Sequence, residues 1–147
     1  MNSHSVFKNP DRARQLLLFD GLEYDSKVAP MDLDGLIEYH NKKRVLLEVK
    51  LNNTPVPNGE RIALERMVND FALAGKEALA IIADHKVFNP KEDVHVRECI
   101  VRELYHSKEK KWRPPRHRTT VADALQGFIY GFISKTYSDV ESVFMDS

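Results

Sequence analysis

The sequence predicts an α/β fold in which helices lie on the faces of a mixed sheet of three to five strands. Two strand-like runs, Gly35–His40 and Val45–Leu51, flank the polar residues 41–44 and indicate a hairpin. Residues 60–74 then carry an apolar stripe at three- and four-residue spacing, which is typical of a helix with one buried face. Ala78–Ala83 is wholly apolar, as expected for a strand buried on both faces. Strand, helix and buried strand in this order predict a βαβ unit.

Proline and glycine residues mark the predicted ends of helices and loops before the second helix. Pro10 predicts the start of a first helix over Asp11 to about Phe19, which would supply an apolar face. Gly21–Pro30 is expected to be a connector with a short strand. Asn52–Gly59 contains two prolines, three asparagines and a glycine, so it predicts a loop.

The second helix is expected to begin with Asn58 as its N-cap, to run to about Ala74 and to end at Gly75. Its buried stripe is Leu64, Met67, Val68 and Phe71. After the loop around Pro90, Val94–Tyr105 alternates loosely between apolar and polar residues. This alternation predicts one more strand, continuous or broken.

A last helix is predicted near the end of the chain, after the charged segment Lys108–Arg118. Thr119 or Thr120 is its expected N-cap, because a hydroxyl oxygen can accept a hydrogen bond from the first free backbone N–H groups. Its expected buried residues are Val121, Leu125, Phe128, Ile129 and Phe132.

Composition indicates one soluble domain over residues 1–147. The chain has 22 basic and 22 acidic residues, so its net charge gives no general attraction to nucleic acid. Cys99 is the one cysteine, which excludes an internal disulfide and favours a reducing, cytoplasmic location. Residues 1–8 lack the apolar core of a signal peptide, and the apolar runs are too short to span a membrane. We therefore expect no membrane partner.

The most informative residues are Asp34, which opens the first strand, and Glu48-Val49-Lys50 in the second. Alternate side chains of a strand share a face, so Glu48 and Lys50 point to the same side. An acid and a lysine inside an apolar strand cost free energy unless they are paired or coordinate an ion. Three other acid-x-lysine triplets occur, starting at Asp25, Asp84 and Glu109, but they lie at strand ends or in charged loops. The context of Glu48 sets it apart from them.

This pattern resembles the PD-(D/E)XK nuclease superfamily, also called restriction-endonuclease-like. The signature of that superfamily is an acid that opens one strand and an acid-x-lysine on its neighbour. The resemblance covers about residues 10 to 105 in element order and implies a restriction-endonuclease-like core. It also implies a Mg²⁺- or Mn²⁺-dependent nuclease that hydrolyses phosphodiester bonds in DNA. RNA stays open as a substrate, and the protein would act alone or as a homodimer.

The resemblance assigns a role to each residue of this pattern. Asp34, Glu48 and the backbone carbonyl of Val49 would bind the metal ion, because Mg²⁺ prefers oxygen ligands and retains several waters. Lys50 would position the attacking water, help to deprotonate it, and stabilise the developing negative charge. Asp32 is the alternative or additional acidic ligand. We favour Asp34 because Gly35 and the strand follow it directly.

Strand pairing gives a test of Asp34. A four-residue turn over residues 41–44 would place Asp34 opposite Leu51, on the wrong face of the hairpin. Directly opposed residues share a face, so Asp34 should lie opposite Lys50 or be shifted by a bulge. The assignment therefore predicts a three-residue turn or a bulge in this hairpin.

Other polar residues are accessory candidates. Glu60 and Arg61 lie off the apolar stripe near the start of the second helix, where many superfamily members place a residue that touches the site. The alternative is a solvated helix face with an Arg61–Glu65 pair. Glu23 or Asp11 would reach the metal from the N-terminal region, as a helix glutamate does in some relatives. We expect His85, just past the buried strand, to make a loop hydrogen bond.

The segment Lys108–Arg118 is the candidate nucleic-acid-binding surface. Cations near an aromatic residue suit phosphate contact and base stacking. The alternative is a solvated loop whose tryptophan folds into the core. Its candidate residues are Lys108, Lys110, Lys111, Trp112, Arg113, Arg116 and Arg118.

The rival function is a catalytically inactive module of the same fold that binds nucleic acid or a protein. Glu48 and Lys50 would then form a buried structural pair beside two incidental aspartates. The rival predicts no Mg²⁺ or Mn²⁺ binding, whereas the nuclease requires it.

Overall fold

The computed structural model describes residues 14–131. The chain divides into two compact units, residues 1–32 and 33–147, which are described separately. Residues 14–19 of the first unit are not helical, so the expected helix is wrong there, while residues 11–13 lie outside the described part. Short helices are marginal without a surface to pack against, and Leu16, Leu17 and Leu18 are exposed. An isolated bridge pairs Tyr24 with Val28, in the connector where a short strand was expected.

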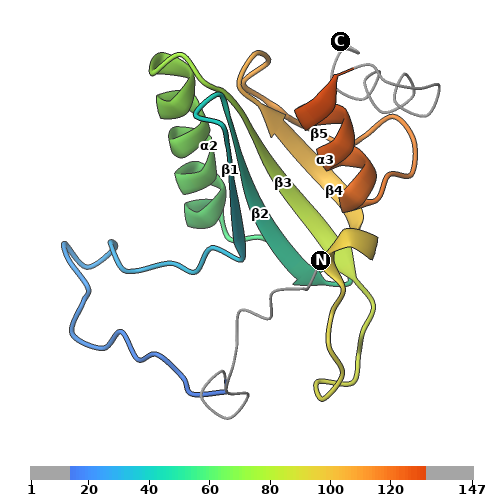
Figure 1. The fold of residues 1–147 in the computed structure, drawn as a ribbon. Coiled ribbons are helices and arrows are strands. Elements are labelled where there is room, and N and C mark those ends of the chain that lie inside the picture. The colour runs from blue at the N-terminus through green and yellow to red at the C-terminus, as the bar shows by residue number, and fades with distance from the viewer. Residues whose placement is uncertain (1–13, 132–147) are drawn as a thin grey trace. The chain divides into compact units, whose positions relative to one another are not determined.

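The second unit is an α/β structure built on a five-stranded mixed sheet, as predicted. The strands lie in the order β1-β2-β3-β4-β5, with one helix against each face (Figure 1). The elements are β1 (Gly35–Tyr39), β2 (Lys43–Leu51), α2 (Asn58–Leu73), β3 (Glu77–His85), the 3₁₀ turn η1 (Val96–Glu98), β4 (Ile100–His106), β5 (Trp112–Arg113) and α3 (Val121–Tyr130). No helix in residues 14–131 combines the length and the apolar character that a bilayer span requires.

β3 is the central strand, and its two faces belong to different apolar clusters. β2 and β3 are parallel and are connected through α2, which confirms the predicted βαβ order. Residues 78–83 are all fully buried, as a strand covered on both faces requires. The cluster under α2 includes Leu46, Leu64, Val68, Ala80 and Tyr105. The cluster under α3 includes Val45, Leu47, Ile81, Val101 and Phe128.

The β1–β2 hairpin has the three-residue turn that the assignment of Asp34 required. Tyr39 pairs with Lys43, so residues 40–42 form the turn in place of 41–44. His40 and Asn41 both have positive φ values, 49° and 58°, a conformation that asparagine and histidine tolerate better than most residues. Gly35 lies opposite Leu47, and the same register places Asp34 opposite Glu48 instead of Lys50. Glu48 and Lys50 share a face of β2, so a position opposite either residue puts Asp34 on the same face as Glu48.

Glycine at position 35 lets the chain enter the sheet close to its neighbour. A Cβ atom there would lie 3.1 Å from Cδ1 of Leu47, which is tighter than ordinary packing. At the end of α2, Gly75 has a φ of +84°, a left-handed conformation that favours glycine and ends the helix as predicted. The N-cap of α2 is Pro57, so the expectation for Asn58 is wrong by one position.

Thr120 is the N-cap of α3 and accepts a hydrogen bond from the backbone N–H of Asp123 at 3.2 Å. Val121 and Phe128 are buried, and Leu125 and Ile129 pack against the same cluster, as predicted. The fifth residue of the expected stripe, Phe132, lies outside the described residues. The predicted strand over residues 94–105 is broken, because η1 precedes β4 and a bulge interrupts the β3–β4 register between Ile82 and Ala83.

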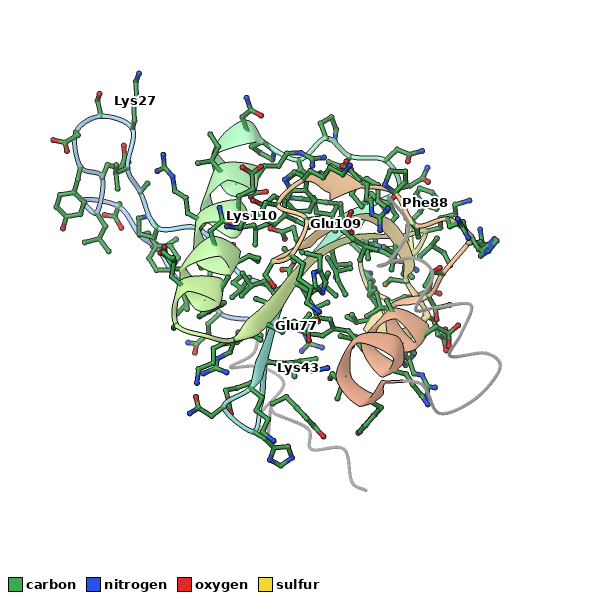
Figure 2. The ribbon with its side chains drawn as sticks, turned by 90° about the horizontal axis from the view of Figure 1, so that it is seen from above. Lys27, Lys43, Glu77, Phe88, Glu109 and Lys110 are labelled. Atoms are coloured by element: carbon green, nitrogen blue, oxygen red, sulfur yellow. The ribbon has the colours of Figure 1, made fainter. Side chains whose placement is uncertain are left out.

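At the opposite end of β3 from His85, Glu77 is surrounded by basic side chains. His106 Nε2 lies 3.0 Å from Glu77 Oε2, Lys43 Nζ lies 3.5 Å from Oε1, and Lys108 Nζ lies 3.8 Å from Oε2 (Figure 2). The hydrogen bond with His106 and the nearby positive charges lower the pKa of Glu77 to about 2, against the opposing effect of burial.

This cluster predicts a contribution to stability that acid removes. Because the pKa of Glu77 is lower in the folded than in the unfolded chain, the carboxylate stabilises the folded state at pH values above 4.5. This stabilisation is lost as the pH falls from 4.5 to about 2. We expect Glu77→Gln to lower the free energy of unfolding at pH 6 by roughly 1 to 3 kcal/mol, and by less near pH 3. Urea unfolding at both pH values measures it. Glu38→Gln, which removes an exposed strand acid paired with Arg44, is the control. Equal losses at both pH values would contradict the prediction.

Candidate active site

The residues singled out in the sequence meet at one end of the sheet. Asp34 directly precedes β1, Glu48 and Lys50 lie near the end of β2, and Glu60 is in the first turn of α2. Figure 1 shows that the start of β1, the ends of β2 and β3 and the first turn of α2 share this end of the second unit. In open α/β sheets, ligands bind outside the carboxyl ends of the strands, so the location is suited to a site.

Glu48 is buried without full compensation. Its exposed fraction is 4%, and it lies on the α2 face of β2 together with Leu46. Its Oε2 atom is inaccessible to solvent and has no hydrogen-bond partner. A buried polar atom without a partner costs free energy, so its retention here calls for a functional reason.

Asp34 is held against β2 beside Glu48. Its Oδ2 atom accepts a hydrogen bond from the backbone N–H of Val49 at 2.7 Å. Burial raises the pKa of Glu48 to about 8, helped by a hydrogen bond with Asp34 and by the charges of Asp34 and Glu60, while Lys50 opposes the shift. Two carboxyl groups can share a hydrogen bond only when one of them is protonated, so the pair retains a proton at neutral pH.

Lys50 reaches across to the helix. Its ammonium lies 3.1 Å from Glu60 Oε2, and both side chains are less than a quarter exposed. This contact brings Glu60 beside Lys50, and the accessory role expected of Glu60 stays a prediction. Lys50 therefore has an acid on each side, Glu48 on its own strand and Glu60 on α2.

Arg61 also packs onto the sheet, but away from Lys50. It pairs with Glu103 on β4, and its guanidinium lies 5.0 Å from the centre of the Trp112 ring. The alternative of an Arg61–Glu65 pair is wrong, because Glu65 Oε2 accepts a hydrogen bond from Trp112 Nε1 at 2.7 Å. These contacts fix the start of α2 over the sheet.

An ion pair that the sequence did not reveal lies beside Lys50. Asp84 is the register partner of Lys50 on β3, and Arg102 Nε lies 3.1 Å from Asp84 Oδ2. Arg102 Nη1 also donates to the carbonyl of Thr54 at 2.8 Å, and the Asn53 N–H donates to Asp84 Oδ1 at 3.3 Å. The pair therefore ties the loop after β2 to the ends of β3 and β4.

Some residues of the segment Lys108–Arg118 pack against the rest of the fold, and others are exposed cations. Trp112 is half-buried, with its ring centre 5.3 Å from that of Tyr105, so the alternative that it folds into the core is correct. Arg113 lies 2.8 Å from Glu109. The exposed cations are Lys108, Lys110, Lys111, Arg116 and Arg118. Figure 2 marks Glu109 and Lys110 in this segment, and its binding to nucleic acid stays a prediction.

Two further candidates belong to the first unit. Glu23 and Asp32 are exposed, and their participation in the site stays a prediction. Of the histidines, His85 makes the expected loop hydrogen bond, accepting at Nδ1 from the Val87 N–H at 3.1 Å.

The donors present suit a hard divalent cation. In residues 14–131 no group of three or more His, Cys, Asp or Glu side chains is arranged to hold a metal. Asp34 and Glu48 offer two carboxyl groups, and the backbone carbonyl of Val49, the next residue of β2, would be the third oxygen; Mg²⁺ commonly takes one or two carboxylates and completes its shell with water. The unpartnered Oε2 of Glu48 and the proton of the carboxyl pair both fit a cation that would replace this proton.

Comparison with known proteins adds no assignment, because the chain matches no protein-family model, no curated protein and no solved structure. What the site can do must therefore be argued from Asp34, Glu48, Lys50 and Glu60.

Proposed function

We propose that this chain is a Mg²⁺- or Mn²⁺-dependent nuclease with a restriction-endonuclease-like core that hydrolyses phosphodiester bonds in DNA. The observation that carries the proposal is the buried Glu48, whose Oε2 has no hydrogen-bond partner and whose pKa is raised to about 8 by burial and by Asp34. A purely structural acid at this position would be expected to have its oxygens satisfied. Lys50 on the same face adds the cation that phosphodiester hydrolysis needs.

Each residue has a task in this reaction. Asp34, Glu48 and the Val49 carbonyl would hold the cation, which would neutralise the phosphate and lower the pKa of the attacking water. The ammonium of Lys50 orients that water and stabilises negative charge that develops on the phosphate oxygens. Glu60 holds the ammonium at the edge of the site.

The distribution of charge favours a polymeric, anionic substrate. The chain is neutral overall, but exposed cations gather in residues 108–118. Lys108 lies beside Glu77, at the opposite end of β3 from the site, and the segment then runs back to Thr120, which bridges Ile100 at the end of the sheet where the site lies. A neutral protein that binds DNA must concentrate its positive charge on part of its surface. DNA is the proposed substrate and the cytoplasm the proposed location, where Cys99 would stay reduced.

The first experiment is a cleavage assay with labelled single-stranded, duplex and branched DNA in Mg²⁺ or Mn²⁺. We expect Glu48→Ala and Lys50→Ala each to lower the cleavage rate by at least about 100-fold while circular dichroism shows folded protein. Glu92→Ala and Lys91→Ala, in the exposed loop after β3, are matched controls and should cut like wild type. Cutting that survives both site variants would overturn the proposal, and the same assay with RNA tests the other polymer.

The second candidate is a binding module with no catalysis. The Lys50–Glu60 contact favours it, since an ion pair of this kind also occurs as a purely structural feature. Isothermal titration separates the two functions: Mg²⁺ or Mn²⁺ binding that disappears in Glu48→Ala supports the nuclease. No binding in the millimolar range supports the module.

A further inference from the structure

A pocket of about 480 Å³ lies past the ends of β2 and β3, at the same end of the sheet as the candidate active site. This volume is within the range of small-ligand pockets and is far too small for a duplex. Asn52 and Asn53 follow β2, Asp84 to Val87 end and follow β3, and residues 94–100 and Arg118 complete the wall. Asp84 lines the pocket and is also the register partner of Lys50, so the pocket lies at the same end of the sheet as the site. The lining residues Val94 and Cys99 belong to the cluster under α3, on the other face of the sheet from Glu48 and Lys50.

The polar groups of the pocket suit an anion attached to a hydrogen-bonding ring. Lys86 and Arg118 are exposed cations, and the charge of Asp84 is offset by Arg102. Because His85 Nδ1 accepts from the Val87 N–H, the ring proton of neutral His85 lies on Nε2, which is then a donor. The side-chain amides of Asn52 and Asn53 can both donate and accept hydrogen bonds.

Of the remaining lining residues, Val87, Val94, Cys99 and Ile100 are apolar and can face a ring, whereas His95 and Glu98 are polar. Phe88 directly follows the lining residue Val87 and is 64% exposed, and Figure 2 marks it in the loop after β3. An exposed phenylalanine beside cations and amides is the arrangement on which an unpaired base stacks.

We propose that this pocket binds one unpaired nucleotide of the substrate strand, next to the scissile phosphate. The inference rests on the proposed nuclease function and deepens it, because it selects strands with unpaired nucleotides over blunt duplex. Lys86 and Arg118 contact the phosphate, the amides and His85 contact the base edge, and Phe88 stacks on its face. Glu98, the other acid of the lining, opposes the phosphate.

The test measures binding without cleavage. Fluorescence anisotropy in EDTA compares a labelled eight-nucleotide thymidine strand with a blunt hairpin duplex. We expect tighter binding of the single strand, weakened about fivefold by Lys86→Ala or Arg118→Ala and about tenfold by Phe88→Ala. Glu98→Gln should tighten binding about twofold, because it removes a repelling charge. Lys91→Ala removes a nearby exposed cation that does not line the pocket and should bind like wild type.

The outcomes separate this inference from the proposed function. Equal binding of single strand and blunt duplex, or pocket variants that bind like wild type, would overturn the inference even where cleavage is observed. Weaker binding of the single strand in Arg118→Ala, together with tighter binding in Glu98→Gln, would support the inference even if no cleavage is found. Competition with thymidine monophosphate and with inorganic phosphate tests whether the pocket takes a strand or a free molecule. If thymidine monophosphate displaces the labelled strand at concentrations like those of the strand itself, the pocket binds a free nucleotide and the inference is overturned.

Discussion

Glu48→Gln is expected to make the metal-free protein more stable at pH 8 while it removes cleavage. The pKa of Glu48 is raised from 4.5 to about 8, so between these pH values the folded protein retains a proton that the unfolded chain has released. Stability due to this group is therefore highest below pH 4.5 and is lost as the pH rises through 8. Glutamine has nearly the same shape, stays neutral and can still donate a hydrogen bond to Asp34.

The expected gain is roughly 2 to 4 kcal/mol in the free energy of unfolding at pH 8, decreasing to near zero at pH 5. Urea unfolding in EDTA at pH 5, 6.5 and 8 measures it, with Glu92→Gln in an exposed loop as the control. Excess Mg²⁺ or Mn²⁺ should reverse the order, because a ligand that binds only the folded state stabilises wild type and not the variant. A difference that does not change with pH would contradict the prediction.

A variant that is more stable and inactive separates the functions proposed for Glu48. Acids in structural ion pairs stabilise the fold, and their removal costs free energy. An acid kept in a destabilising position is more readily explained by the ion or substrate that it binds. The stability measurement thus bears on function even before a substrate is found.

The central part of the fold could be predicted from the sequence because its patterns are strong. Period-two alternation placed Glu48 and Lys50 on one face, and the apolar run 78–83 indicated a strand covered on both sides. The need for Asp34 to share their face predicted the turn length. The predicted hairpin register was wrong by two residues, because Asp34 lies opposite Glu48 and not Lys50. A turn without glycine gives no signal for where it begins, and here His40 and Asn41 take the positive φ values.

Contacts across elements could not be predicted. The Lys50–Glu60 distance depends on how Leu64 and Val68 seat α2 on the sheet, and no local pattern specifies that placement. Arg102 reaches Asp84 because a bulge shifts the β3–β4 register at Ile82/Ala83, and a bulge leaves no mark in an alternating sequence. The first helix failed because its apolar residues, Leu16 to Phe19, are consecutive and lack the three- and four-residue spacing that marks a helix with one buried face.

The Asp84–Arg102 ion pair is expected to keep Lys50 in contact with Glu60, because Arg102 neutralises the charge of Asp84. Both side chains are less than a fifth exposed, and Asp84 is the register partner of Lys50 on the adjacent parallel strand. In Arg102→Ala, Asp84 loses its guanidinium, and its carboxylate becomes a competitor for the ammonium that now contacts Glu60. Neighbouring strands are about 4.8 Å apart, so a lysine side chain spans the distance easily.

We expect Arg102→Ala to lower the free energy of unfolding by roughly 1 to 3 kcal/mol, because it leaves a partly buried charge unpaired. It should also lower the single-turnover cleavage rate about tenfold, since Lys50 would be drawn away from the water that it positions. Arg66→Ala, on the exposed side of α2, is the control and should change neither quantity.

The double variant Asp84→Asn/Arg102→Ala decides how Arg102 acts. Asparagine carries no charge to attract Lys50, so the cleavage rate should return to within about threefold of wild type even where the stability does not fully recover. A rate that stays low in the double variant would mean that Arg102 contacts the substrate itself. Recovery would instead make it a positioning residue, which acts through Asp84 on Lys50 from the far side of the pair.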